Sequence, residues 1–376
     1  MTIHVDLNAT VLSENRRAFL ARPGPECRYF DLFREMCAIG PDLPYMELER
    51  GLPIGDHVHM EDMLKRSAAF RRWRWKTRYE DPPSEDLSDY RHENRVRPTS
   101  SAQFRLILRG YFEAAKLGDL ALVPPSAWQS DALLIEFSTG PGEFVYRKIP
   151  YGEYLLDVPV RKFREIGVVP KRLLPLHILG IVTKPNGFVQ FGKSDTADLH
   201  EIAYDSFIKD NEYCSTFHVG ENAYSLEHDL LFAVFVKVVV ANSKAISESL
   251  DPLSIEDAFH GEFGDYTPTL QSNVNSPGWL RLKGSRITPL LASALFSLAV
   301  EIGPHAVQAA ENGMITVGNS KAPKDDACVA RVHKETLEFI KFLRLEKWAP
   351  ACELARKVSD RTGMHSQSTI SQSKGQ

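Results

Sequence analysis

Cysteine is scarce in this sequence. Five cysteines are scattered over 376 residues, and no two of them form a Cys-x-x-Cys pair. An odd, dispersed set argues against a disulfide framework, and the missing pairs argue against a cysteine-rich zinc site. We expect structural thiols in a reducing compartment, and we predict neither a metal nor a cofactor.

Long apolar runs are also missing. Residues 230–242, interrupted by Lys237, and residues 290–300 are both shorter than the roughly 18–20 residues that cross a bilayer. The first 17 residues lack the basic stretch followed by an apolar stretch that marks a signal peptide. We therefore expect a cytoplasmic protein with no membrane partner.

The sequence has no overall excess of positive charge. Its formal net charge is −4, and charged residues make up 25% of the chain, close to the average for globular proteins. A generic affinity for polyanions is thereby excluded, so binding to nucleic acid would need a local basic patch.

Several catalytic fingerprints are absent as well: the G-x-S-x-G elbow, H-E-x-x-H, the EF-hand loop and G-x-G-x-x-G. No catalytic residue is predicted, and a binding or assembly protein is favoured over an enzyme.

The order of elements predicts an α+β fold with a helical N-terminal part, a hairpin-rich central region and an all-helical C-terminal part. We expect boundaries that give an N-terminal region at residues 1–100, a mixed region at 101–283, a helical region at 284–358 and a disordered polar tail at 359–376. Residues 80–100, with paired prolines and many carboxylates, are the best candidate for a linker.

Turn residues and periodicity place the main elements. Residues 132–137 and 143–149 flank a Gly-Pro-Gly turn, and residues 176–183 and 188–191 flank Pro-Asn-Gly, so both pairs are expected to be hairpins. Thr288-Pro289 predicts the start of a helix that Gly303 ends. The apolar run at residues 230–240 is either a buried strand or a buried helix, and its periodicity does not decide.

The most distinctive segment, residues 64–79, combines basic and aromatic side chains and contains no acidic residue. Guanidinium groups suit bidentate contacts to phosphate, and aromatic rings stack on unpaired bases with little sequence preference. The predicted nucleic-acid-binding residues of this segment are Lys65, Arg66, Arg71, Arg72, Trp73, Arg74, Trp75, Lys76 and Arg78. One alternative is a face that packs within the chain or against a protein partner, because arginine stems also pack well on aromatic rings. Another is a helix that lies on a membrane surface.

Residues 187–194 match the phosphate-loop pattern G-x-x-x-x-G-K-[ST]. In such a loop Lys193 would reach the β- and γ-phosphates of a nucleotide and Ser194 would hold Mg²⁺. The four middle residues are bulky and favour a strand, however, so the same residues also fit the second strand of a hairpin followed by a helix.

The sequence thus predicts a protein that binds RNA or another single-stranded nucleic acid, or that self-associates, through residues 64–79. Two alternatives stay open: a phosphate-loop nucleotide hydrolase that uses Lys193 and Ser194, and a structural scaffold for protein–protein contacts without a ligand.

Overall fold

The computed structural model describes residues 2–76, 81–91, 98–125, 131–151, 153–184, 187–220, 224–273, 277–322 and 327–373. The chain forms two compact units. One of them is a continuous stretch of sequence that interrupts the sequence of the other. We call Asn15–Ala203 the inserted unit, and Met1–Glu14 together with Tyr204–Gln376 the outer unit. The expected boundaries at residues 100, 283 and 358 do not coincide with this division.

The inserted unit is built on a seven-stranded sheet with the strand order β4-β8-β6-β5-β3-β9, in which β7 also pairs with β8. Its strands are β3 (Ala18–Ala21), β4 (Ala38–Ile39), β5 (Leu120–Val123), β6 (Asp131–Phe137), β7 (Val145–Tyr151), β8 (Tyr154–Pro170) and β9 (Phe188–Gln190). The 17-residue strand β8 pairs with β7 through its first half and with β6 through its second half. A bulge opposite Leu134 and Ile135 interrupts the β6–β8 register, which bends the long strand.

Five helices accompany this sheet: α1 (Phe30–Glu35), α2 (Met60–Lys76), α3 (Pro98–Arg109), α4 (Leu176–Val182) and α5 (Lys193–Ala203). A π-helical turn, Gly110–Ala114, continues α3. Apolar side chains of α1, α2, the π-helical turn and the inner face of the sheet form one buried core.

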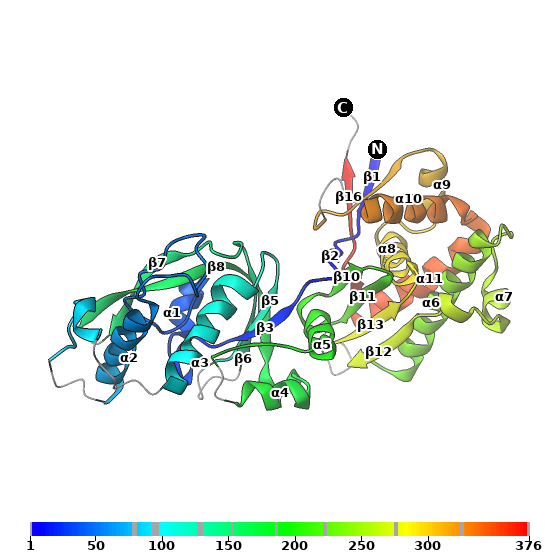
Figure 1. Cartoon of the computed structure of the whole chain (residues 1–376). Helices are drawn as coiled ribbons and strands as arrows, with labels where there is room; N and C mark the ends of the chain where they lie inside the picture. Colours follow the sequence, from blue (N-terminus) through cyan, green and yellow to red (C-terminus); the bar gives the residue numbers. More distant parts are fainter. Residues whose placement is uncertain are drawn as a thin grey trace. The chain divides into compact units, whose positions relative to one another are not determined.

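The outer unit contains two sheets. The larger follows the order β12-β13-β11-β10-β2, with β15 also paired to β11, and the smaller has the order β14-β1-β16. The strands are β1 (Thr2–Asp6), β2 (Thr10–Leu12), β10 (Ser206–Lys209), β11 (Glu212–Val219), β12 (Thr269–Asn273), β13 (Gly278–Gly284), β14 (Ile315–Gly318), β15 (His365–Ser366) and β16 (Thr369–Ser373). Strand β1 is central in the small sheet, so the two ends of the chain lie side by side (Figure 1).

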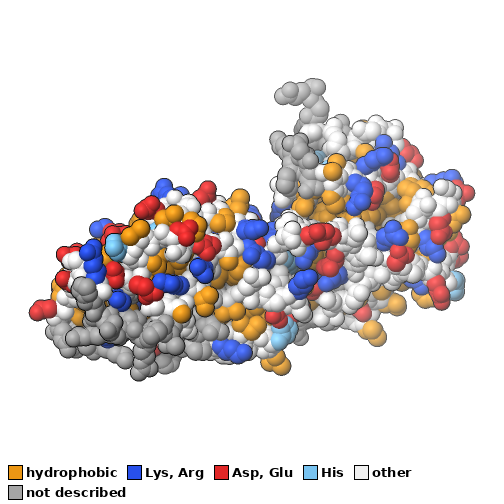
Figure 2. All heavy atoms as spheres, viewed as in Figure 1, with side chains coloured by type: hydrophobic (Ala, Val, Ile, Leu, Met, Phe, Trp, Pro, Cys, Tyr) orange, Lys and Arg blue, Asp and Glu red, His pale blue; other side chains and the backbone are white. Residues whose placement is uncertain are grey.

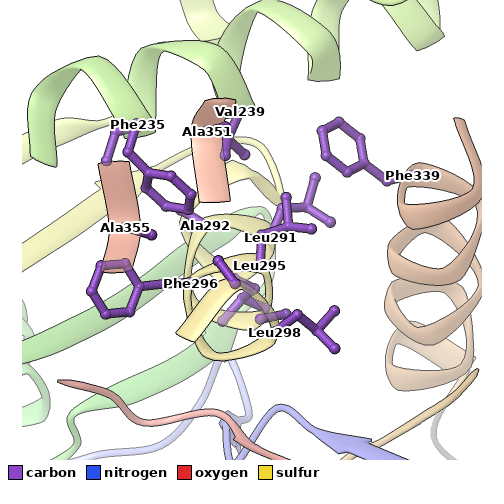
Figure 3. Packing of buried hydrophobic residues seen from close by; sticks show 14 of the residues in the cluster. Phe235, Val239, Leu291, Ala292, Leu295, Phe296, Leu298, Phe339, Ala351 and Ala355 are labelled. Carbon is purple, nitrogen blue, oxygen red and sulfur yellow. The ribbon is translucent and has the colours of Figure 1, made fainter. Parts of the chain in front are cut away.

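The helices of the outer unit are α6 (Leu226–Ser247), α7 (Ile255–His260), α8 (Thr288–Glu301), α9 (His305–Glu311), α10 (Ala327–Phe342) and α11 (Leu345–Thr362). Helix α8 is buried along nearly its whole length, as expected for a helix that is apolar on all sides. Figure 3 shows its side chains Leu291, Leu295 and Phe296 among those of α6, α10 and α11. The predicted start of this helix at Thr288-Pro289 is confirmed.

The predicted fold class is wrong at both ends of the chain. The N-terminal part is rich in strands, because β1 and β2 complete sheets of the outer unit and β3 and β4 join the inserted sheet. The C-terminal part is not all-helical either, since β14, β15 and β16 lie within it. Residues 359–373, expected to be disordered, instead form the end of α11 and two paired strands.

The central hairpins are also placed differently. Strands β6 and β7 exist, but each pairs with β8 rather than with the other. Residues 176–182 form helix α4, not a strand. The apolar run at residues 230–240 lies within helix α6.

By length and composition, α6 could cross a membrane, and so could the bent pair α8 and α9 within the described part of the chain. More than half of the apolar stretch of α6 is buried inside the outer unit. A buried core helix of a soluble protein has these same properties, so α6 is compatible with a soluble protein.

Candidate functional site

Helix α2 carries the described part of the basic aromatic segment, and it divides those residues between the interior and the surface. Arg66 is only 3% exposed. Its guanidinium donates to the carbonyl oxygens of Glu85 at 2.8 Å and Tyr45 at 2.7 Å, and it pairs with the carboxylate of Glu47 at 2.6 Å. Arg66 therefore holds the preceding and following chain segments against α2.

Two further predicted residues also make contacts within the unit. Trp73 is 6% exposed and packs edge-on against the rings of Phe70 and Tyr154. Lys65 donates to the carbonyl oxygen of Tyr90 at 3.2 Å. The observed contacts of Trp73 and Lys65 are those expected if the segment packs within the chain.

Arg71 lies at the edge of the core. Its Nε donates to the carboxylate of Asp42 at 3.3 Å, and its guanidinium carbon lies 4.8 Å from the centre of the Phe104 ring. Asp42 is only 5% exposed and the Arg71 side chain is 23% exposed, so the ion pair is partly shielded from water and orients the guanidinium on the ring. Arg71 thus combines a fixed charge with a flat stacking partner.

The other predicted residues of the segment lie further out or beyond the described residues. Arg72 is exposed, and Arg74 is partly buried with interactions of its own. The side chains of Trp75 and Lys76 and the whole of Arg78 lie outside the described residues.

A hollow of about 460 Å³ opens beside Arg71. That volume lies in the range of small-ligand pockets. We call this hollow the arginine pocket; it is lined by Arg22, Gly24, Pro25, Glu26, Pro41, Asp42, Leu43, Arg71, Gln103, Phe104, Ile107, Thr183 and Gly187.

Arg22 supplies a second guanidinium to the arginine pocket. Its Nη2 donates to the carbonyl oxygens of Val182 and, at 2.6 Å, of Lys184. Carbonyl oxygens fix a guanidinium in position without removing its charge. Arg22 and Arg71 therefore bring two oriented guanidinium groups to one hollow, which the carboxylates of Glu26 and Asp42 also line.

The backbone on one side of the pocket has an unusual conformation. Gly24, Glu26 and Cys27 all have positive φ angles, 81°, 55° and 56° respectively. Two adjacent non-glycine residues in the left-handed region carry a conformational cost, and such residues concentrate at functional sites.

Two titratable side chains, Cys27 and Tyr29, lie next to residues that line the pocket. Burial raises the pKa of the Cys27 thiol, and the nearby Arg22 only partly opposes this shift. Burial, together with the charge of Asp42, also raises the pKa of Tyr29. Both groups therefore stay protonated at neutral pH, so neither is a thiolate or phenolate nucleophile.

The charge on the visible surface is mixed. Figure 2 shows Lys and Arg side chains interspersed with Asp and Glu over the face in view. Attraction of a polyanion would thus depend on a local arrangement such as the arginine pocket rather than on the field of the whole molecule.

The phosphate-loop pattern does not form a phosphate-binding loop. Phe188–Gln190 is the extended strand β9, which pairs with β3 in antiparallel register. The backbone N–H of Gly192 donates to the Asp195 carboxylate at 3.3 Å, which puts a negative charge at the start of α5. Lys193 and Ser194 thus follow a strand instead of closing a compact loop around an anion.

Sequence reasoning missed most of the arginine pocket. Of the predicted residues, Arg71 lines it, whereas Arg22, Gln103, Phe104 and Ile107 come from segments far away in the sequence. The turn-forming run Arg22-Pro23-Gly24-Pro25 was the available signal for an irregular loop. Nothing in the sequence pattern paired that loop with α2.

Comparisons with protein-family models, with curated proteins and with solved structures find no match to this chain.

Proposed function

We propose that the inserted unit binds single-stranded nucleic acid, RNA or DNA, at the arginine pocket. The observation that carries the proposal is Arg71, whose guanidinium is stacked on Phe104 and held by the buried Asp42 at the wall of a ligand-sized hollow.

Each chemical part of a single strand has a counterpart here. A phosphate is a bidentate acceptor that suits the planar guanidinium groups of Arg22 and Arg71. An unpaired base offers a flat face to Phe104 and to the Arg71 plane, and such stacking contributes about 1–3 kcal/mol per base. The exposed Arg72 lies about 100° around the helix from Arg71, so it adds positive charge to α2 without lining the pocket.

We also propose a cytoplasmic location. All five cysteines are free thiols, and three of them are buried. Free, scattered cysteines fit a reducing compartment.

The test is fluorescence anisotropy of the full chain with labelled oligouridylate and oligothymidylate of about 12 nucleotides, at low and at moderate salt. We expect binding that weakens as salt rises, because contacts to phosphate release counterions. A duplex of matched length should bind more weakly, because its bases cannot stack on Phe104.

Three variants probe the pocket. Arg71→Lys keeps the charge but removes the planar fork, Phe104→Leu removes the aromatic face, and Arg72→Gln removes an exposed charge. We expect Arg71→Lys and Phe104→Leu each to weaken binding by about tenfold, and Arg72→Gln mainly to lower the salt dependence.

The matched control removes two charges from an exposed strand of the same unit. Arg147 and Lys148 are exposed on β7, and the double variant Arg147→Gln with Lys148→Gln should leave binding close to wild type. If this control loses as much affinity as Arg71→Lys does, or if none of the pocket variants changes the affinity, the assignment to the arginine pocket is wrong. Thermal melting of each variant separates loss of binding from loss of folding.

A further inference from the structure

The outer unit contains an apolar groove of about 530 Å³ that the proposed function does not use. Helix α6 forms one wall, strands β12 and β13 form the other side, and the loop of residues 261–264 closes one end. We call it the strand–helix groove. One of its sides is therefore the last strand of a sheet.

Strand β12 lies at the edge of the larger sheet. In the described part of the chain it pairs with β13 and with no other strand. Thr269, Leu270 and Ser272 are exposed, and no residue of β12 is charged. The outward N–H and C=O groups of an edge strand can pair with a further strand, and charged side chains are a common protection against this. An exposed, uncharged edge therefore suits the addition of an extended segment.

The surface beside this edge is apolar. Leu270 lies opposite Leu282 across the two strands, so both side chains lie on the same face of the sheet. Leu270 is 41% exposed, and Ala233, on the α6 wall, is also exposed. Because alternate side chains of a strand point to one face, a strand added to β12 would place apolar side chains on this surface.

Lys237, on α6, brings an ammonium group to the groove. Its Nζ donates to the carbonyl oxygen of Phe259 and lies 5.1 Å from the centre of the Phe259 ring. That carbonyl accepts only one of the three N–H donors of a lysine. Among the described residues Lys237 forms no ion pair with a carboxylate, whereas Lys244, further along α6, lies 3.9 Å from Glu248.

The position of Lys237 gives an added segment a direction. Residues 259–264 precede β12 in the chain, and they contact α6 through Lys237 and through Lys244, which donates to the carbonyl oxygen of Glu262 at 3.3 Å. Lys237 therefore lies at the end of the groove where β12 begins. A segment antiparallel to β12 would have its carboxyl end there.

From these observations we propose that the strand–helix groove binds the C-terminal segment of a partner protein as an antiparallel strand added to β12. Its last side chain is apolar and lies between α6 and Leu270, and its terminal carboxylate meets Lys237. The edge strand, the apolar surface and the lysine each match one part of such a segment: its backbone, its side chain and its terminal charge. The proposal is independent of the arginine pocket, because every residue that carries it belongs to the outer unit.

The test is fluorescence anisotropy of the full chain with labelled peptides of about six residues, in which threonine and valine alternate and the last residue is leucine or aspartate. Each peptide is made with a free carboxylate and with a C-terminal amide. We expect the leucine-ending carboxylate peptide to bind, its amide to bind about tenfold more weakly, and the aspartate-ending peptides to bind most weakly.

Three variants test the charges. Lys237→Gln should lower the affinity for the carboxylate peptide about tenfold and leave that for the amide unchanged, which also shows that the groove is still folded. Lys244→Gln is the matched control, because this lysine lies on the same helix outside the groove, and it should bind like wild type. Glu262 also lines the groove, so Glu262→Gln should bind the carboxylate peptide more tightly, since it removes a like charge.

Methylation of peptide N–H groups tests the strand pairing. Only alternate N–H groups of an added strand face β12, so N-methylation of one alternate set should abolish binding and that of the other set should not. The proposal is overturned if no peptide binds at about 1 mM, if carboxylate and amide bind equally to wild type, or if both methylated sets behave alike. Dodecanoate is a further probe: if it binds and no peptide does, the groove holds a lipid chain and the peptide proposal is wrong.

Discussion

The side chain of Arg161, on β8, is completely buried in the inserted unit. Its Nη1 donates to the carbonyl oxygens of Tyr111 at 2.8 Å and Ala115 at 2.7 Å, and its Nη2 donates to that of Thr139. Burial lowers the pKa of Arg161 to about 10, so the group still carries its charge at neutral pH. One guanidinium thereby ties the π-helical turn to the sheet.

Replacing Arg161 by Met should destabilise the protein by about 3 kcal/mol or more, because it leaves buried carbonyl oxygens without donors. Urea denaturation followed by circular dichroism measures the loss. Arg164→Met on the same strand is the control, since Arg164 is exposed and its pair with Glu136 should contribute no more than about 1 kcal/mol. Equal losses in the two variants would contradict the role assigned to Arg161.

Asp6, at the end of β1, gives a prediction for the dependence on pH. Burial alone would raise its pKa, but hydrogen bonds from Ser320 and Asn8 outweigh that effect and hold the pKa below its ordinary value of 3.8. The carboxylate accepts the backbone N–H groups of Asn8 and Ser320, each at 3.0 Å.

A group whose pKa is lowered by folding stabilises the native state above its unfolded pKa and loses that effect as pH falls through the folded pKa. Wild type should therefore melt at a higher temperature than Asp6→Asn at neutral pH. The difference should shrink once the pH falls below about 4 and vanish in stronger acid. A difference that stays constant over this range would show that the carboxylate charge is not what stabilises the fold.

At the scale of single residues, the sequence pattern marks a basic aromatic segment but does not show which of its arginines are accessible. Arg66, Arg71 and Arg72 are chemically equivalent in the sequence, yet one is buried, one lines a pocket and one is exposed. That division depends on the segments that pack against α2. Asp42 and Phe104, which orient Arg71, are about 30 residues away from it on either side.

At the scale of elements, the junction between α3 and β9 depends on Gly110. A Cβ at this position would lie 2.3 Å from the ring of Phe188. That ring packs in turn on Tyr111 and Phe19, with centroid separations of 4.4 and 5.1 Å. Strand β9 thus reaches the helix backbone because glycine leaves room for Phe188.

Gly110→Ala should lower stability by about 1–3 kcal/mol, because an aromatic ring with packed neighbours must move. Gly180→Ala is the matched control: Gly180 lies in helix α4, and a Cβ there would meet nothing within 4 Å. The control should be neutral or stabilising, since alanine is the better helix former. Chemical denaturation measures the free energy of unfolding of both variants. A Gly110→Ala variant that is more stable than wild type would contradict the close approach of Phe188 to the Gly110 backbone.

The sequence predicted elements well where one strong local signal decides. Thr288-Pro289 begins α8 as expected, and Gly303 lies two residues past its end. Residues 176–182, by contrast, are rich in strand-forming residues yet form α4, which buries Ile178 and Val182 four positions apart on one face. In this segment the packing of the surrounding residues overrides the intrinsic preference for a strand. Neither residue propensities nor turn residues predict such an effect.

At the scale of the whole molecule, the insertion of one unit into the other could not be predicted. Residues 2–12 contain nothing that specifies partners more than 190 residues away, yet β1 pairs with β14 and β16 and β2 pairs with β10. A short strand with mixed polarity is compatible with many neighbours. Its pairing is set by the edges that the rest of the outer unit leaves open.

This arrangement predicts how fragments behave. Residues 15–203 contain a complete sheet and core and should fold alone, with a cooperative melting transition. Residues 204–376 alone lack β1 and β2 and should unfold or aggregate, because open strand edges remain.

A permuted chain provides the control for the fragment experiment. Ser373 pairs with Thr2, so a short linker from the end of residues 204–373 to residues 2–14 should restore the missing strands. Size-exclusion chromatography and thermal melting compare the two fragments. A stable, monomeric fragment of residues 204–376 would contradict the need for the N-terminal strands.

The same chain order has a consequence for biosynthesis. Ile3 pairs with Ile315, so 312 residues must be added before the first strand made can meet this partner. At about 5–20 residues per second this wait lasts roughly 15 to 60 seconds. The apolar residues Ile3, Val5 and Leu7 leave the ribosome long before their partners exist, while the inserted unit can already fold. During translation, this N-terminal segment is where we expect chaperones to bind.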